Sequence, residues 1–143
     1  MIRVTRRYRF SASHRLHAAG LGDAENRELY GKCNSPFGHG HNYEMEVSVR
    51  GPVEERSGHA VDIEVLDGLV RREVLETFEH RNLNEEIAAF RTTVPTTENL
   101  AREAVRRLKQ NWSAVFPAGP RLEKVAIAET SRNAFEVSAH EIE

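Results

Sequence analysis

Three histidines occupy positions at which two predicted strands would bring their side chains together. His39 and His41 lie in the run Gly38-His39-Gly40-His41, and residues two apart on a strand point to the same face. His14 continues the apolar face of the first predicted strand, whose end lies beside the start of the second if the two pair antiparallel. Three neutral imidazoles with an open fourth position are the ligand set of a catalytic zinc site. The pattern therefore predicts Zn²⁺ at these histidines; the alternative is a surface His-x-His pair without metal.

Cys33 is the only cysteine, which excludes a disulfide within the chain and a site built from two thiolates of one chain. It lies six residues before His39 in the polar segment 31–36, next to Lys32. Nearby positive charge makes the thiolate form of a cysteine available as a base or nucleophile. Three interpretations stay open: a small buried thiol, a thiolate base, and a fourth metal ligand that would close the site.

Two carboxylates also stand where they can act in a site. Glu129 shares the parity of Val125 and Ile127, so an acid ends an apolar strand face. A carboxylate there matches the paired N–H donors of a guanidine-like heterocycle edge, or it is an exposed acid at a strand end. Glu79 precedes His80 at the end of a predicted helix. This pair can form a proton relay, or the histidine simply complements the negative end of the helix dipole.

The predicted strands and helices place these residues at the ends of elements. The first strand alternates apolar and polar residues from Ile2 to Ala12, and the second alternates over 41–50 before Gly51. A helix is predicted over 62–78 from apolar spacings of three and four. A second helix follows Pro95, with Thr96 or Thr97 as its N-cap and an apolar side of Leu100, Ala104, Leu108 and Trp112.

Two further strands, one with Val125 and Ile127 and one with Phe135 and Val137, complete the order ββααββ. This order predicts an α+β domain: an antiparallel sheet with two helices on one face. The pattern gives no clear reason for the other face to be highly polar, and a four-stranded sheet has two open edges. We therefore expect neighbouring subunits to complete the structure.

Composition limits the class of protein. The chain has 143 residues, 39% of them hydrophobic and 29% charged, with a net charge of −2. We expect a single globular domain, 1–143, without the basic surface that nucleic acid or an anionic membrane requires. No apolar run approaches the roughly 20 residues that span a bilayer, and no signal peptide is evident, so a cytoplasmic location is expected.

Four blocks in the same order along the chain resemble the 6-pyruvoyl-tetrahydropterin synthase family. They are Phe10-Ser11-Ala12-Ser13-His14-Arg15-Leu16, Gly31-Lys32-Cys33-Asn34-Ser35-Pro36-Phe37-Gly38-His39-Gly40-His41-Asn42-Tyr43, Thr96-Thr97-Glu98-Asn99 and Glu129-Thr130. The likeness runs from Tyr8 to the last strand, and its most specific part is the block from Cys33 to His41. The family includes the 6-carboxy-tetrahydropterin synthases of the queuosine pathway, which usually have a shorter gap before His-x-His. The five-residue gap here resembles the pyruvoyl-forming branch.

The resemblance implies a tunnelling fold, in which three ββααββ subunits close a twelve-stranded β-barrel. Two such trimers stack as a homohexamer with sites between subunits. It also implies the substrate 7,8-dihydroneopterin triphosphate and the product 6-pyruvoyl-tetrahydropterin, with release of triphosphate. The enzyme would thus be a carbon–oxygen lyase of tetrahydrobiopterin biosynthesis.

By position in the family pattern, His14, His39 and His41 would hold Zn²⁺, and the Cys33 thiolate would be the base. His80, oriented by Glu79, would complete the relay. Glu129 would bind the amino and ring N–H groups of the pterin, with Thr97 and Glu98 contributing from the pocket wall.

One residue departs from the pattern: the family usually has Asp before the relay histidine, and here it is Glu79. The extra methylene changes the reach of the carboxylate, so a slower or altered proton transfer is one consequence to test. Two alternatives to the pyruvoyl-forming enzyme remain. One is a 6-carboxy-tetrahydropterin synthase, and the other is a catalytically inactive pterin- or purine-binding protein of the same fold.

Overall fold

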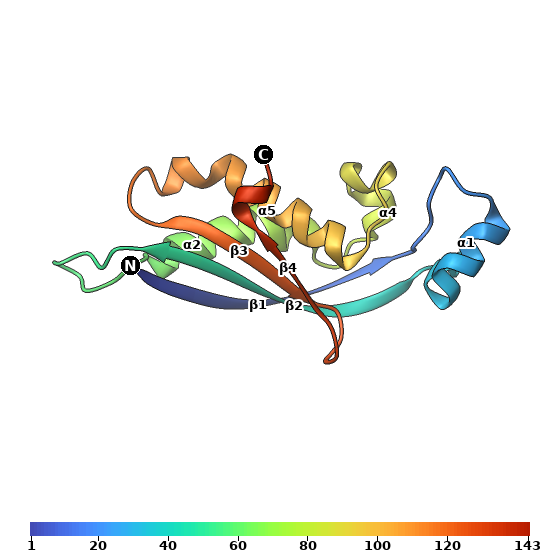
Figure 1. Ribbon diagram of the computed structural model, residues 1–143, viewed down its shortest axis with the longest axis horizontal. Helices are drawn as coiled ribbons and strands as arrows, with labels where there is room; N and C mark the ends of the chain where they lie inside the picture. The colour runs from blue at the N-terminus through green and yellow to red at the C-terminus, as the bar shows by residue number, and fades with distance from the viewer.

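The computed structural model describes residues 1–143 as one sheet with helices on a single face (Figure 1). The four antiparallel strands lie in the order β1-β2-β3-β4. Their bounds are β1 Ile2–His14, β2 His39–Gly51, β3 Arg121–Ala128 and β4 Ala134–Ser138. The main helices fall between β2 and β3 in the chain, so the predicted ββααββ order is confirmed.

The pairing of β1 with β2 determines where the histidines meet. The register runs from Ile2 opposite Gly51 to His14 opposite His39. Alternate residues of each strand face the helices. The residues of β2 on this face are buried: Tyr43, Met45, Val47 and Val49. His14, His39 and His41 continue the same face at its far end, as the alternation predicts.

The helix predicted over 62–78 is present, but it widens in its middle. α2 (Ile63–Val70) begins at its N-cap Asp62, whose side chain accepts a hydrogen bond from a backbone N–H of the first turn. A π-helical turn, Arg71–Leu75, then leads into the short α3 (Glu76–Phe78). Because a π turn holds more residues than an α turn, it rotates the next residues of the chain around the helix axis. The turn thus sets the direction in which the chain leaves this helix.

α5 (Thr97–Val115) begins at Thr96, whose hydroxyl accepts a hydrogen bond from Asn99 N at 3.2 Å. Of the two candidates for the N-cap, the structure therefore selects Thr96. Thr97 is the first helical residue, and it is buried, with 2% of its surface exposed. Its hydroxyl is consequently available for a partner outside the helix.

Short helical segments lie where none is predicted. They are α1 (Asp23–Tyr30), α4 (Leu83–Glu86) and the 3₁₀ turns Gly31–Asn34, Ala88–Arg91 and Ala139–Glu141. The single buried residue of α1 is Asn26, which donates from its side-chain amide to the carbonyl oxygens of Ala18, Leu21 and Gly22. A helix held by polar contacts has no apolar periodicity from which to predict it.

The sheet face away from the helices is charged, so the expectation that it is not highly polar is wrong. Ion pairs cross neighbouring strands there: Arg7–Glu46 at 2.7 Å, Arg9–Glu44 at 3.1 Å and Lys124–Glu136 at 2.8 Å. This face has no covering layer, and β1 and β4 each have no neighbouring strand on one side (Figure 1). None of the helices combines the length and apolar character that crossing a membrane would require.

Candidate metal centre

The three predicted histidines come together at the end of the helix-covered face. The ring centroids lie 4.8 Å apart for His14 and His39, 5.0 Å for His14 and His41, and 4.5 Å for His39 and His41. Glu129, one residue beyond β3, joins them, and one ligand atom from each of the four lies within 4.8 Å of the others. The convergence predicted from strand parity is thus present, with a carboxylate added.

Two ring nitrogens in this group have no hydrogen-bond partner although they are buried. They are Nε2 of His14 and Nε2 of His41. Glu129 Oε1 lies 2.7 Å from His41 Nε2, yet the two make no directed hydrogen bond. Three imidazole nitrogens and one carboxylate oxygen form a donor set that suits Zn²⁺. The residues present therefore fit the predicted metal.

A backbone carbonyl fixes the tautomer of His14. Its Nδ1 lies 2.7 Å from the carbonyl oxygen of Pro95. Because a carbonyl oxygen can only accept, Nδ1 carries the proton and Nε2 presents its lone pair to the cluster. The hydroxyl of Tyr43 lies 3.3 Å from the same Nδ1. Neither contact is predicted from the sequence.

Burial favours the neutral form of His14 and His41, because it lowers the pKa of both side chains. It lowers the pKa of His14, against a smaller opposite effect of the hydrogen bond to Pro95, and the neighbouring imidazoles lower it further. Burial also lowers the pKa of His41, although the Glu129 carboxylate acts in the other direction. Neutral imidazole is the form that binds a metal, so the site is prepared for one near neutral pH.

Gly38 allows the chain to enter this site. Its φ is 69°, and a Cβ at this position would lie 2.9 Å from the carbonyl oxygen of His14. Gly40 has no such constraint, since a Cβ there would lie 3.9 Å from its nearest neighbour, the carbonyl oxygen of Ala12. Of the two glycines before the histidines, the geometry thus requires Gly38.

Of the predicted substrate-binding residues, two are joined directly. The Thr97 hydroxyl donates to Glu129 Oε2 at 2.6 Å, and Glu129 belongs to the four-residue group with the histidines. Glu98 is exposed in the first turn of α5, and its side chain makes no hydrogen bond within the chain. The carboxylate of Glu129 therefore has one oxygen toward the histidines and the other on Thr97.

Cys33 lies outside the four-residue group. It is a half-buried free thiol in the 3₁₀ turn Gly31–Asn34. The turn is held near the site because Leu16 N, two residues after His14, donates to the Cys33 carbonyl oxygen at 2.8 Å. The geometry favours Glu129 over Cys33 as a fourth ligand, and it leaves the thiol available for another role.

Glu79 and His80 do form a pair, at the outer edge of β1. Glu79 Oε1 lies 3.0 Å from His80 Nε2, and its other oxygen accepts from Ser11 N at 3.0 Å. His80 N also donates to the Ser11 carbonyl oxygen. His80 has a positive φ of 58°, unusual for a residue other than glycine, and its side chain is 79% exposed. An exposed imidazole held in a strained conformation is a common sign of function.

His80 is not a member of the group formed by His14, His39, His41 and Glu129 in its own chain. His80 borders a hollow of about 290 Å³ over the ends of β1 and β2, together with His41 of the cluster and the strand residues Ser11, Ser13 and Asn42. Those strand residues alternate with the cluster histidines and therefore lie on the open face of the sheet. His41 thus borders the same hollow as His80, although the relay pair lies outside the four-residue group.

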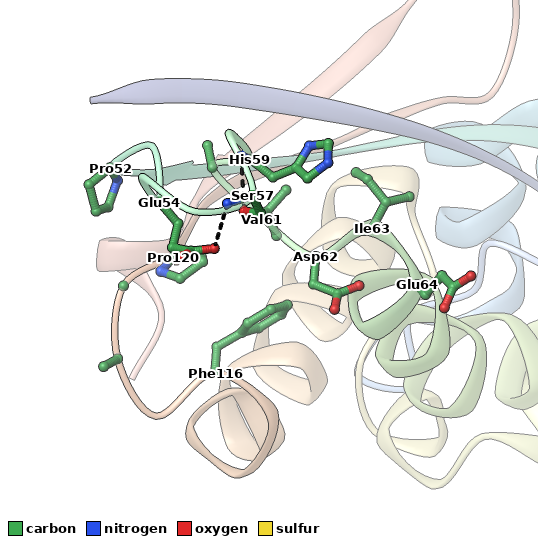
Figure 2. Close-up of a pocket in the computed structure, with 13 residues that line it drawn as sticks. Pro52, Glu54, Ser57, His59, Val61, Asp62, Ile63, Glu64, Phe116 and Pro120 are labelled. Carbon is green, nitrogen blue, oxygen red and sulfur yellow. Dashed lines mark hydrogen bonds between the residues drawn. The ribbon is translucent and has the colours of Figure 1, made fainter.

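A larger pocket, of about 670 Å³, lies at the opposite end of the sheet, between the loop after β2 and the loop before β3 (Figure 2). Phe116 and Val61 form apolar parts of its wall, and Glu54, Asp62 and His59 lie around it. None of the predicted site residues borders this pocket.

Comparison with known proteins gives consistent matches. A family model described as 6-pyruvoyl tetrahydropterin synthase matches residues 3–140. The chain is 39% identical over 130 residues to the 6-pyruvoyl tetrahydrobiopterin synthase of Homo sapiens, which covers 91% of this chain and 86% of that protein. The identity is 40% over 130 residues to that of Poecilia reticulata, covering 91% and 85%.

Among solved structures, Caenorhabditis elegans 6-pyruvoyl tetrahydropterin synthase matches with a TM-score of 0.87 and 42% identity, over 96% of this chain and 94% of that one. This match confirms the predicted α+β tunnelling fold of the subunit. A 6-carboxy-5,6,7,8-tetrahydropterin synthase of Rickettsia conorii matches over 80 residues at 30% identity, which is 56% of this chain and 49% of that protein.

Proposed function

The chain belongs to the 6-pyruvoyl tetrahydropterin synthase family, and from this premise we propose that it converts 7,8-dihydroneopterin triphosphate to 6-pyruvoyl-tetrahydropterin, with elimination of triphosphate. The observation that carries the proposal is the cluster of His14, His39, His41 and Glu129, in which two buried nitrogens have no partner. A binding module without a metal would gain nothing from leaving them unpaired.

The three histidines would hold Zn²⁺, with His14 oriented by the Pro95 carbonyl. When bound, such an ion supplies Lewis acidity to the side-chain hydroxyls of the substrate and so acidifies the adjacent C–H. The protein contributes the fixed ring orientations and a buried environment that strengthens the electrostatic interactions at the site.

Cys33 is the base that removes the activated proton. The turn that carries Cys33 is hydrogen-bonded to Leu16, two residues after His14, and this proximity supports the role. The position of Cys33 outside the ligand group supports it as well. A thiolate bound to the metal would be a poorer base, because the cation would hold its lone pair. The proton then passes between the substrate carbons with the help of the second acid–base group, His80.

The relay pair of one active site comes from a neighbouring copy of the chain. Glu79 and His80 lie at the outer edge of β1, with the imidazole exposed, and neither belongs to the four-residue group of the histidine cluster. An exposed catalytic pair outside the histidine cluster of its own chain suits a site shared between subunits. We propose a homohexamer of two stacked trimers, each closing a twelve-stranded barrel, as the assembly that supplies it.

The substitution of Glu79 for the family's Asp is accommodated by the structure. The longer side chain reaches Ser11 N with one oxygen and His80 Nε2 with the other, so it both anchors the segment to β1 and orients the imidazole. This double contact supports a working relay and argues against the inactive pterin-binding alternative.

Pterin recognition falls to Glu129, with Thr97 and Glu98 on the wall of the site. A carboxylate accepts two parallel N–H donors well, as a pterin presents them from its amino group and ring. The contact between Thr97 and Glu129 places these two residues together, and Glu98 is exposed beside them.

The 6-carboxy-forming reaction is the second candidate, because it starts from the same substrate. The longer matches to pyruvoyl-forming relatives and the five residues between Cys33 and His39 favour the first candidate. Incubation of zinc-loaded protein with dihydroneopterin triphosphate, followed by mass spectrometry of the pterin product, separates the candidates. A pyruvoyl side chain is expected. A carboxy product with acetaldehyde would assign the queuosine branch, and bound pterin without turnover would indicate a binding protein.

A further inference from the structure

The carboxylate of Glu129 is divided between two tasks. Oε1 lies 2.7 Å from His41 Nε2 and 3.8 Å from His14 Nε2, so it takes the fourth corner of the ligand group. Oε2 accepts the hydroxyl proton of Thr97 at 2.6 Å. Since Oε2 is engaged, the carboxylate can offer the cluster a single oxygen.

One turn of chain orients two of the four ligand groups. Pro95 accepts from His14 Nδ1, and Thr97, two residues later and 2% exposed, donates to Glu129. Thr96 between them caps α5 and contacts neither ligand. The start of a 19-residue helix is a rigid support for such contacts.

We propose that Glu129 is the fourth metal ligand in the substrate-free protein, and that Thr97 is the positioning residue that holds it there. This inference rests on the metal site of the proposed function. A metal held by three nitrogens and one oxygen would have all four tetrahedral positions filled, as in structural zinc centres. The carboxylate cannot bind a pterin and the metal with the same oxygen, so recognition of the pterin by Glu129 opens the site.

Cobalt is a suitable probe, because the visible spectrum of protein-bound Co²⁺ responds to its ligands. We expect azide, which needs an open position, to leave the Co²⁺ spectrum of the wild type unchanged. In Glu129→Gln and Thr97→Val the position is open, and azide should then alter the spectrum. Metal affinity, measured by competition with a chelator, should fall 10- to 100-fold in Thr97→Val, the usual effect of losing a group that orients a ligand.

Two neighbouring variants are matched controls. Thr97→Ser keeps the hydroxyl and should behave as the wild type in both measurements. Thr96→Ala removes the helix cap and should lower stability while leaving azide response and metal affinity unchanged. The melting temperature of each metal-free variant shows whether it is folded.

The inference is overturned if azide binds the wild type as readily as Glu129→Gln, or if Thr97→Val, folded, keeps wild-type metal affinity. Failure of the metal site itself has a different signature: His39→Ala would then bind Co²⁺ as well as the wild type. If His39→Ala loses Co²⁺ while Glu129→Gln keeps the azide response and metal affinity of the wild type, the histidine metal site stands. Only the assignment of Glu129 as its fourth ligand is then rejected.

Discussion

The two ends of the sheet differ in what their polar groups do. In the larger pocket, Glu54 accepts hydrogen bonds from the backbone N–H groups of Arg56 and Ser57, and Asp62 caps α2 (Figure 2). These polar groups hold their own loops in shape. At the histidine end, buried nitrogens of His14 and His41 have no partner within the chain.

This difference shows that the volume of a pocket does not by itself identify a ligand-binding site. An unpaired polar atom in the interior costs about 1–3 kcal/mol, so a protein retains one where a ligand completes it. Two ring nitrogens at the histidine end carry this cost. None of the residues that line the pocket of about 670 Å³ has a buried side-chain polar atom without a partner. Substitutions at the two ends should therefore have different effects on metal binding, turnover and stability.

The largest effect is expected from His39→Ala. The variant keeps two imidazoles and the Glu129 carboxylate, so it should hold Zn²⁺ far more weakly against a competing chelator, and bound metal and turnover should fall together. Metal analysis of the purified protein and a triphosphate-release assay check this. Retention of stoichiometric zinc would place the metal elsewhere.

Cys33→Ala should separate metal binding from catalysis. The variant should keep wild-type zinc content and lose roughly 10²- to 10⁴-fold in kcat, the usual contribution of a general base. Zinc content and kcat are measured on the same preparation. If zinc disappears with the thiol, Cys33 is a ligand and the assignment to Glu129 is wrong.

A mixing experiment tests whether the relay and the cluster come from different chains. Cys33→Ala and His80→Ala are each expected to be inactive. A shared site needs an intact Cys33 from one chain and an intact His80 from its neighbour. When the two variants are coexpressed in equal amounts and assemble at random, roughly a quarter of the sites meet both conditions, so roughly a quarter of wild-type turnover should return. A mixture as inactive as its parents would mean that each site is built within one chain.

Parity and register account for the part of the site that could be predicted. Alternation along β1 and β2 places His14, His39 and His41 on one face, and antiparallel pairing brings them to one end. Both follow from sequence because side chains on a strand repeat every two residues. Glu129 shares the parity of Val125 and Ile127, which likewise predicts the sheet face on which it lies.

The contacts around the ligands could not be predicted in the same way. The Pro95 carbonyl that orients His14 is a backbone atom, and a backbone acceptor has no residue type to mark it. The direction of the Glu129 carboxylate depends on Thr97, which a different segment of the chain supplies. The helix α1 escaped prediction because Asn26, rather than an apolar side, holds it.

At the pocket end, Phe116→Ala should change stability alone. Phe116 is 8% exposed and its ring centroid lies 4.9 Å from that of Trp112. Its truncation should lower the free energy of unfolding by about 3 kcal/mol, as for buried aromatic residues in general. Chemical denaturation measures this change. Zinc content and kcat should match the wild type, and a loss of either would give the pocket a part in catalysis.

The smallest effect concerns the pH dependence of the metal-free protein. Burial lowers the pKa of His14, so at mildly acidic pH the unfolded chain binds a proton that the folded chain does not. Stability should therefore be complete above the ordinary pKa of about 6.5, and fall by up to about 1.4 kcal/mol per pH unit below it, until the lowered pKa is reached. Urea denaturation between neutral and acidic pH measures the slope.

His14→Gln should reduce that slope. An identical slope in His14→Gln would show that another group causes the pH dependence.

The most direct test of the catalytic role of the histidine end is a titration of the metal-free protein with Zn²⁺ while turnover of dihydroneopterin triphosphate is recorded. If this end is the catalytic metal centre, turnover should start near zero, rise in proportion to added zinc and stop rising at one ion per chain. Turnover that is already complete without metal, and unchanged by zinc, would contradict that role.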